Sequence, residues 1–297
     1  MSAPPDTLCI GSALWDVIGR AGQSLPIGAD VPGRITRTPG GVALNIAIML
    51  ARLGRRPAML TALGDDDPGL SLIAACARLG VSCDHATILP GRPTDRYMAI
   101  EGTNGLIAAI ADAHTLEAAG AAILAPLTDG RLAGADAPWT GPVVLDGNLT
   151  GALLAQIATS PLFAAARLAV APASPGKALR LAPLLPRPNV RLYVNLAEAA
   201  LLSGAPAADA AAAARAMLAA GAARVLVTDG ARAAADGCAR RGVLTATPPA
   251  VTPVRVTGAG DTFMAAHFVA EDRGAPRDAA LAHALAIAAA YVAGKDA

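Results

Sequence analysis

The sequence predicts an α/β protein with a mostly parallel central sheet and helices on both of its faces. Short apolar runs rich in Val, Leu and Ile alternate along the chain with longer Ala- and Leu-rich runs of helical length. Repeated strand–helix units of this kind form parallel sheets covered by helices. At 297 residues, 54% of them hydrophobic, the chain is long enough for a full core, and no linker or repeat divides it. We therefore expect a single domain over residues 1–297.

Turn residues separate the expected elements in chain order. We expect strands at residues 8–10, 57–63, 97–101, 106–111, 121–124, 142–145, 168–171, 192–194 and 223–228, and an extended segment at 252–256. We expect helices at residues 40–54, 70–79, 152–158, 178–185, from 195 onward, at 207–220 and at 262–270. The helix at 40–54 is apolar on nearly every side, so it should be deeply buried.

A hairpin interrupts this alternation. The Asn-Gly pair at Asn104 and Gly105 lies between two apolar runs, which is a strong hairpin signal. A hairpin inserted between strand–helix units fits a flap over a site or a dimer surface, and we interpret it as a lid. Because lid hairpins with apolar faces often pair, we also expect a homodimer.

Composition excludes several classes of function. The formal net charge is +1 and there is no basic block, which argues against nucleic-acid binding. The four cysteines show no CxxC or zinc-like spacing, which fits free thiols in a reducing cytosol. Residues 1–6 lack the features of a secretory signal, and the apolar stretch 279–294 is short and contains a histidine. We expect a cytoplasmic protein that does not span a membrane.

The most informative stretch runs from Val256 to Ala266. Two glycines and Asp261 stand between an extended segment and an Ala-rich helix. A Gly-rich turn at a helix start leaves free amides in a positive potential, which makes an anion site. An aspartate repels a bound anion but can take a proton from a nucleophile that attacks a phosphate. The alternative is that Asp261 only caps the helix.

Two polar residues near the N-terminus are further candidates. Asp16 follows the first strand, and ligands of α/β proteins bind beyond strand ends. Asn45 lies in the first turns of the apolar helix, where its amide needs partners, and a ligand hydroxyl is one candidate. Gly40 and Gly41 allow a ligand to approach the backbone closely. The alternatives are an ordinary strand-end acid and an amide bonded to nearby backbone.

Two common nucleotide-binding motifs are missing. Gly176-Lys177 lacks the upstream glycine and the following hydroxyl of a P-loop, and Gly258-Ala259-Gly260 lacks the third glycine and the position of a dinucleotide fingerprint. The sequence therefore argues against a P-loop NTPase and against a dinucleotide dehydrogenase.

Three motifs together resemble the PfkB (ribokinase-like) carbohydrate kinases. They are Gly40-Gly41-Val42-Ala43-Leu44-Asn45, Asn195-Leu196-Ala197-Glu198 and Gly258-Ala259-Gly260-Asp261-Thr262-Phe263. Their order and spacing match over essentially the whole chain. The resemblance is greatest to pseudouridine kinases, on residues 40–54, 94–112 and 172–178. It implies a ribokinase-like three-layer sandwich with a small β lid from roughly residues 12–38 and 94–112.

The resemblance also implies roles for individual residues. Asp261 would be the catalytic base, and the amides of Gly258, Ala259 and Gly260 the anion hole. The substrate would contact Asp16, Gly40, Gly41, Asn45, Thr94 and Tyr97. The nucleotide would contact Asn195, Thr228, Gly230, Lys177 and His283, and Mg²⁺ would bind Glu198 through water. The implied reaction is phosphoryl transfer from Mg-ATP to the 5′-hydroxyl of a ribose-containing substrate, with pseudouridine as the first candidate.

Some positions depart from the family pattern, and other functions stay open. Arg255 stands where an acid often helps to hold a monovalent cation, so potassium activation is in doubt. Ala233, Ala266 and His283 replace residues common near the nucleotide. Arg34 and Arg96 are further candidates to contact the base. The alternatives are another kinase of the family, acting on ribose, adenosine or a related sugar or nucleoside, or a catalytically silent sugar or nucleotide sensor.

Overall fold

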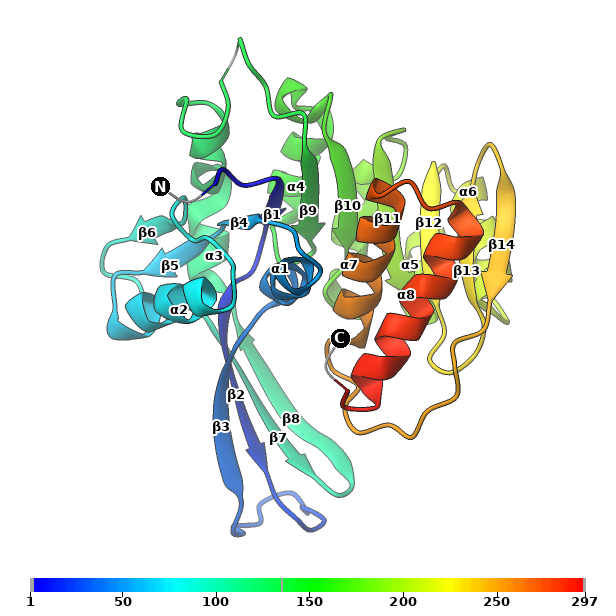
Figure 1. Cartoon of the computed structure of the whole chain (residues 1–297). Helices are drawn as coiled ribbons and strands as arrows, with labels where there is room; N and C mark the ends of the chain where they lie inside the picture. Colours follow the sequence, from blue (N-terminus) through cyan, green and yellow to red (C-terminus); the bar gives the residue numbers. More distant parts are fainter. Residues whose placement is uncertain (1–2, 135, 296–297) are drawn as a thin grey trace.

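The computed structural model describes residues 3–134 and 136–295, and its elements form layers around one large sheet (Figure 1). The sheet has eight strands in the order β14-β13-β12-β11-β10-β9-β1-β4. The strands from β12 to β4 are parallel, and β13 and β14 form an antiparallel edge. Their bounds are β1 Thr7–Ile10, β4 Pro57–Leu60, β9 Pro142–Asp146, β10 Arg167–Ala171, β11 Val190–Asn195, β12 Arg224–Thr228, β13 Ala234–Cys238 and β14 Gly242–Ala246. The predicted mostly parallel sheet is confirmed.

Helices cover both faces of this sheet (Figure 1). The buried residues of one group of helices share a core with one face of the sheet: α1 Val42–Arg52, α2 Asp67–Arg78, α7 Ala259–Asp272 and α8 Arg277–Val292. The other face packs on α3 His114–Ala119, α4 Gly151–Thr159, α5 Leu196–Ser203, α6 Ala210–Ala219 and the 3₁₀ helices η1 Gly120–Leu127, η2 Pro161–Phe163 and η3 Pro175–Leu184. The α/β three-layer architecture is therefore as predicted.

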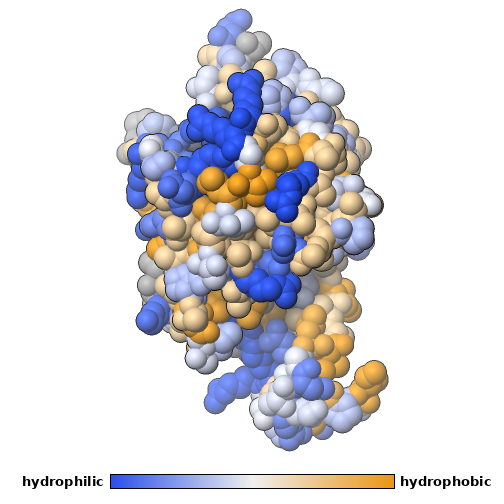
Figure 2. All heavy atoms as spheres, turned by 90° about the vertical axis from the view of Figure 1, so that its right-hand side faces the viewer, coloured by the Kyte–Doolittle hydropathy of each residue, from blue (hydrophilic) through white to orange (hydrophobic). Residues whose placement is uncertain are grey.

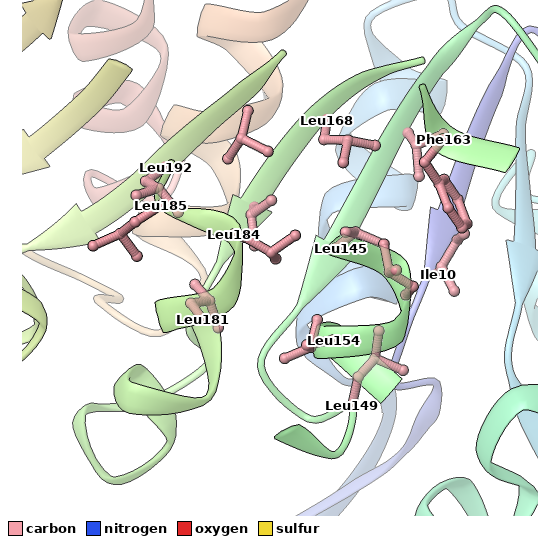
Figure 3. Packing of buried hydrophobic residues seen from close by; sticks show 14 of the residues in the cluster. Ile10, Leu145, Leu149, Leu154, Phe163, Leu168, Leu181, Leu184, Leu185 and Leu192 are labelled. Atoms are coloured by element: carbon pink, nitrogen blue, oxygen red, sulfur yellow. The ribbon is translucent and has the colours of Figure 1, made fainter. Parts of the chain in front are cut away.

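Alternation along the strands assigns side chains to the two cores. In β1, Leu8 and Ile10 belong to the core with α4, whereas Cys9 faces α1 and α7. In β9, Leu145 belongs to the core with α4 and Val144 to the core with α1 and α7, because successive strand residues point to opposite faces. Figure 3 shows one of these cores, where leucines from the strands, α4 and η3 pack closely. Both faces of each central strand are apolar, which is why these strands read as continuous hydrophobic runs.

A second sheet of four strands projects from the body as the lid (Figure 1). Its strands are β2 Leu14–Arg20, β3 Arg34–Gly40, β7 Arg96–Gly102 and β8 Gly105–Asp112, in the order β3-β2-β7-β8. The predicted Asn-Gly hairpin joins β7 to β8, with Gly105 at φ 94°, a left-handed conformation that glycine adopts without strain. The lid therefore draws on both of the expected segments.

Several element boundaries differ from the prediction. Residues 121–124 form part of η1 instead of a strand, and Ile123 and Leu124 bury their side chains in the helical layer. This prediction was wrong because a short apolar run has the same pattern in a strand and in a buried turn of helix. The segment at 178–185 forms η3, a 3₁₀ helix with Pro183 inside it.

Other boundaries moved by smaller amounts. The predicted strand 57–63 divides into β4 and β5 (Ala62–Gly64), and β5 pairs with β6 (Thr87–Leu89) in a separate small sheet. The predicted helix 207–220 begins later, because Asp209 caps α6 by accepting a hydrogen bond from the amide of Ala212 at 2.7 Å. Residues 252–256 belong to no strand, and the amide of Val254 donates to Val292 at the end of α8.

Within the described residues, the helices are all too short or too polar to cross a bilayer.

Asp146, the last residue of β9, connects the sheet to the start of α1. Its fully buried Oδ2 accepts hydrogen bonds from the Ser12 amide (3.0 Å), the Ser12 hydroxyl (2.6 Å) and the Ala43 amide (2.9 Å). The last bond places a carboxylate at a helix N-terminus, where the helix dipole stabilises negative charge. A Cβ on Gly11 would lie 2.6 Å from Cγ of Asp146, so only glycine fits there. Asp146 therefore sets the position of α1 relative to the strand ends.

We expect Asp146→Ala to lower the free energy of unfolding by about 3 kcal/mol, because the buried amides of Ser12 and Ala43 lose their acceptor. Urea unfolding followed by circular dichroism measures the change. Asp129→Ala is the matched control, since Asp129 and its partner Arg131 are exposed, and it should leave stability near that of the wild type. Equal stability of the two variants would contradict this role of Asp146.

Candidate active site

The N-terminus of α7 forms the centre of the site. Gly258 caps the helix in a left-handed conformation at φ 85°, and a Cβ there would lie 2.6 Å from the hydroxyl of Tyr291. The Ala259 amide donates to the carbonyl of Val256 at 3.0 Å. Among the described residues, the amides of Gly260 and Asp261 have no acceptor, as is usual for the first turn of a helix. These two amides and the helix dipole can bind an anion.

Asp261 lies in the first turn of α7 and contacts α1. Its Oδ2 accepts a hydrogen bond from Nδ2 of Asn45 at 3.0 Å. The two residues are 216 positions apart in the chain and come from helices that pack against each other. The contact brings together the acid and the amide that the sequence had marked separately.

The carboxyl of Asp261 has a strongly perturbed acidity. Burial raises its pKa to about 7, the Asn45 hydrogen bond opposes this rise, and the negative charges of Asp146, Asp16 and Glu198 add to it. Burial also raises the pKa of Asp16 to about 6. A carboxylate with a pKa near neutrality is able to act as a general base under physiological conditions.

Asp16 lies on the lid strand β2, at its junction with the body. In the lid register it pairs with Tyr97 on β7 and with Thr38 on β3. A Cβ on Gly40 would lie 2.1 Å from Oδ2 of Asp16, so the glycine makes room for this carboxylate. Burial and the charge of Asp16 raise the pKa of Tyr97. Asp16, Gly40 and Tyr97 thus form one polar group.

A cleft of about 160 Å³ lies beside Asp261, at the C-terminal ends of β10, β11 and β12. Of the predicted residues, it is lined by Asn195, Glu198, Thr228, Gly260 and Asp261. Ala173, also in the lining, has φ 70°, which is uncommon for a residue with a side chain and often marks a functional site. The position of the cleft agrees with the general rule for ligands in α/β sheets.

Asn195 and Glu198 form a reciprocal cap at the start of α5. The Glu198 amide donates to Oδ1 of Asn195 at 2.9 Å, and the Asn195 amide donates to Oε2 of Glu198 at 2.8 Å. Burial raises the pKa of Glu198. Glu198 also lines the cleft, so its carboxylate lies where it can reach a bound ligand. Carboxylate oxygens suit Mg²⁺, and the donor set fits a hydrated ion.

The predicted residues that do not line the cleft include Thr94, Lys177, Gly230 and His283. The buried hydroxyl of Thr94 donates to Oδ1 of Asp66 at 2.5 Å, and Lys177 donates to Oδ1 of Asn148, also at 2.5 Å. Gly230 is exposed after β12, and His283 is exposed on α8. Gly41, at φ 96°, lies where a Cβ would come within 2.7 Å of the Ser12 carbonyl, so it serves the close approach of two backbones.

Sequence reasoning did not assign Ser12, Asp146 and Asn148 to the site. Nδ2 of Asn148 donates to the hydroxyl of Ser12 at 2.9 Å, and so continues the hydrogen bonds that hold the start of α1. The available signal was the Asp-Gly-Asn group at the end of a predicted strand. This signal could not identify Ser12 as the partner of Asp146, because the two residues are 134 positions apart in the chain.

Comparison with known proteins places this geometry in a family. Residues 5–297 match the model of the "pfkB family carbohydrate kinase". The chain belongs to the pfkB family. Pseudouridine kinase of Escherichia coli K12 is 40% identical over 117 residues, which are 39% of this chain and 37% of that protein. The aligned part thus spans less than two fifths of this curated relative.

Solved structures share the fold of this pfkB protein over nearly its whole length. A carbohydrate kinase from Agrobacterium tumefaciens is 27% identical with a TM-score of 0.77, covering 95% of this chain and 89% of that one. Arabidopsis thaliana ribokinase, solved with ribose and ATP, is 22% identical with a TM-score of 0.78, covering 99% and 95%. The predicted ribokinase-like fold and the family resemblance are confirmed.

We expect the carboxyl of Asp261 to titrate with a midpoint near 7 and that of Asp16 near 6, because burial disfavours their charged forms. NMR of protein labelled with ¹³C at the aspartate carboxyls measures both, and Asp261→Asn and Asp16→Asn assign the signals. Asn45→Ala should move the Asp261 midpoint higher, since the bond to the charged form is lost. A midpoint for Asp261 in the ordinary range of about 4 would contradict this electrostatic picture.

Proposed function

We propose that this pfkB protein is an ATP-dependent kinase that phosphorylates the 5′-hydroxyl of a ribose-containing substrate, with pseudouridine as the first candidate. The observation that carries the proposal is Asp261, a carboxyl with a pKa of about 7 at the start of α7, beside two free amides and 3.0 Å from Asn45. The Escherichia coli pseudouridine kinase supports the choice of substrate through its partial identity.

In the proposed reaction, Asp261 takes the proton from the attacking hydroxyl as that oxygen bonds to the γ-phosphorus of ATP and ADP leaves. The amides of Gly260 and Asp261, with the dipole of α7, stabilise the charge on the transferring phosphoryl group. Asp16 and Asn45 hold the hydroxyls of the sugar, and Gly40 and Gly41 let it approach the backbone. The chain's main contribution is thus orientation and charge stabilisation.

The nucleotide would occupy the cleft between β11, β12 and α7. Asn195 and Thr228 line this cleft, and Gly230 follows Thr228 closely in the chain. Glu198 would hold Mg²⁺ through water, and the ion would neutralise phosphate charge when bound. We keep Lys177 and His283 as proposed nucleotide contacts. Because neither residue lines the cleft, its side chain would have to move to reach the nucleotide. Closure of the lid would exclude water and limit hydrolysis of ATP.

No monovalent cation is part of the proposal. Arg255 replaces the acid that the family often has, and its guanidinium lies 3.8 Å from the ring centroid of Tyr291. Its Nε also donates to the Tyr291 carbonyl at 2.9 Å. A fixed positive charge at this position disfavours a second cation nearby.

A panel of acceptors tests the substrate. Purified protein with Mg-ATP is offered pseudouridine, uridine, adenosine or ribose, and ADP release is measured by a coupled assay. We expect kcat/KM for pseudouridine to exceed the others at least tenfold, with the phosphate on the 5′ oxygen by ³¹P NMR. Preference for another acceptor would support the proposed kinase activity but change the proposed substrate. No ADP release with any acceptor would favour a catalytically silent sensor.

Asp261→Asn tests whether turnover depends on Asp261 as the base. The amide keeps the shape of the side chain but cannot take a proton, so kcat should fall by about 10²–10⁴ while ATP still binds. In the wild type, log kcat/KM should rise with pH up to about 7, because the base must be deprotonated. Near-normal turnover of the variant would remove Asp261 from the mechanism.

We further propose that the protein is a homodimer through its lid. Lid strands alternate, so the face opposite to Asp16 carries Ile35, Met98, Ile100 and Ile110, with exposed fractions of 80%, 46%, 46% and 69%. Figure 2 shows orange apolar residues along one side of the lid. An exposed apolar patch of this kind is typical of a protein interface.

Light scattering after gel filtration tests the dimer. We expect the wild type at twice the chain mass of 29.4 kDa and Ile110→Glu as a monomer, because the new charge would be buried in the interface. Leu201→Glu is the matched control, since Leu201 is 45% exposed on α5, away from the lid. A monomeric wild type, or a dimeric Ile110→Glu, would exclude this interface.

A further inference from the structure

A second cavity is lined by residues at the N-terminal ends of the central strands. Figure 1 shows that the lid projects from the opposite end of the main sheet. The cavity has a volume of about 420 Å³, within the range of about 300–1,000 Å³ for small-molecule sites. It is lined by the first residues of β10 and β11, by Arg224 at the start of β12, and by Cys238 at the end of β13. Because β10 to β12 are parallel, this cavity and the cleft beside Asp261 lie at opposite ends of the strands.

Four arginines line this cavity, and much of their hydrogen-bonding capacity is unused. They are Arg167, Arg191, Arg224 and Arg240. Arg167 donates to Asp272 through Nη2 only, and Arg191 pairs with Glu271 through Nη1 only. Arg240 is exposed and has no ion pair or side-chain hydrogen bond within the described part of the chain. Each guanidinium carries five N–H donors, so several remain directed to solvent or to a ligand.

Buried or half-buried acids hold three of the four arginines, Arg167, Arg191 and Arg224, without lining the cavity themselves. Arg224 is fixed by Asp236 at 2.7 Å and by Glu271 at 2.5 Å, and Asp236 has a side-chain exposure of 0%. Asp236 also pairs with Arg277 at 3.0 Å. These carboxylates therefore have cationic partners already, and Arg240 adds a positive charge that none of them balances. The lining of the cavity is thus positively charged and favours an anion.

Apart from Asn189, most of the remaining lining is apolar. Leu168, Ala169, Val190 and Phe268 contribute to it, and Phe268 belongs to α7. Apolar walls beside several guanidiniums suit a small organic molecule with one strongly charged group. Arginine matches the geometry of phosphate oxygens and can bind them through two parallel hydrogen bonds.

We propose that this cavity is a second ligand site, which binds a small phosphorylated organic molecule such as a sugar phosphate. The phosphate contacts Arg240 and the free donors of Arg167 and Arg191, and the organic part lies on the apolar residues. The site is separate from the proposed active site. Helix α7 has Asp261 in its first turn and Phe268 and Glu271 near its other end, so one rigid element contacts both sites.

Isothermal titration calorimetry of the full chain with ribose 5-phosphate tests the proposal. Mg²⁺ and the non-hydrolysable analogue AMP-PNP are present throughout, so that the nucleotide cleft is filled. We expect binding to the wild type, and at least tenfold weaker binding to Arg240→Ala and to the Arg167→Gln/Arg240→Ala double variant. Since Arg240 is exposed and unpaired, its replacement should leave the fold intact, and unchanged AMP-PNP affinity verifies this for both variants.

Two further variants separate the cavity from other binding. Arg215→Ala removes an exposed arginine of α6 and should bind as the wild type does. Asp16→Ala alters the proposed sugar site and should also keep this affinity. The proposal is overturned if ribose 5-phosphate does not bind, if binding is lost in Asp16→Ala, or if both arginine variants bind as tightly as the wild type.

Discussion

The contact between Asn45 and Asp261 is the interaction on which the site depends. It joins the first turns of α1 and α7, two helices from opposite ends of the chain that pack on the same face of the sheet. The acid is withdrawn from water and lies near three other carboxylates, so its pKa rises to about 7. The amide of Asn45 limits this rise, because it favours the charged form. The balance of these effects leaves the carboxyl of Asp261 with a pKa near neutrality.

The position of α1 is in turn set by a buried charge. Asp146 binds the turn after β1 and the amide of Ala43 in the first turn of α1, and Asn148 extends these bonds to Lys177. The hydrogen bonds that this carboxylate accepts fix the turn after β1 against the start of α1. The sheet thereby fixes the position of Asn45 and, through the hydrogen bond from Asn45, that of Asp261. The geometry of the proposed site therefore depends on the junction of β1 and β9.

The two ends of the sheet have opposite electrostatic character. At the C-terminal ends of the strands, Asp16, Asp261 and Glu198 collect acids around a helix N-terminus, an arrangement suited to handling protons, a metal ion and phosphates. At the N-terminal ends, arginines pair with Glu271 and Asp272, which lie in the last turn of α7. Cations are favoured near a helix C-terminus, which is consistent with the arginines found there. The lid adds a third surface, polar toward Asp16 and apolar on its other face.

The sequence by itself determined the class of fold, the lid hairpin and the main candidates of the site. Apolar alternation, the Asn-Gly turn and the Gly-Ala-Gly-Asp stretch each act locally, so they can be read from neighbouring residues. Short apolar runs were ambiguous, as at 121–124, because strand and buried helix share that pattern. Only the tertiary structure decided which polar residues meet. Asp146 with Ser12, the bond from Asn45 to Asp261, and the arginines around the distal cavity all depend on packing between elements distant in the chain, and no local pattern encodes such distances.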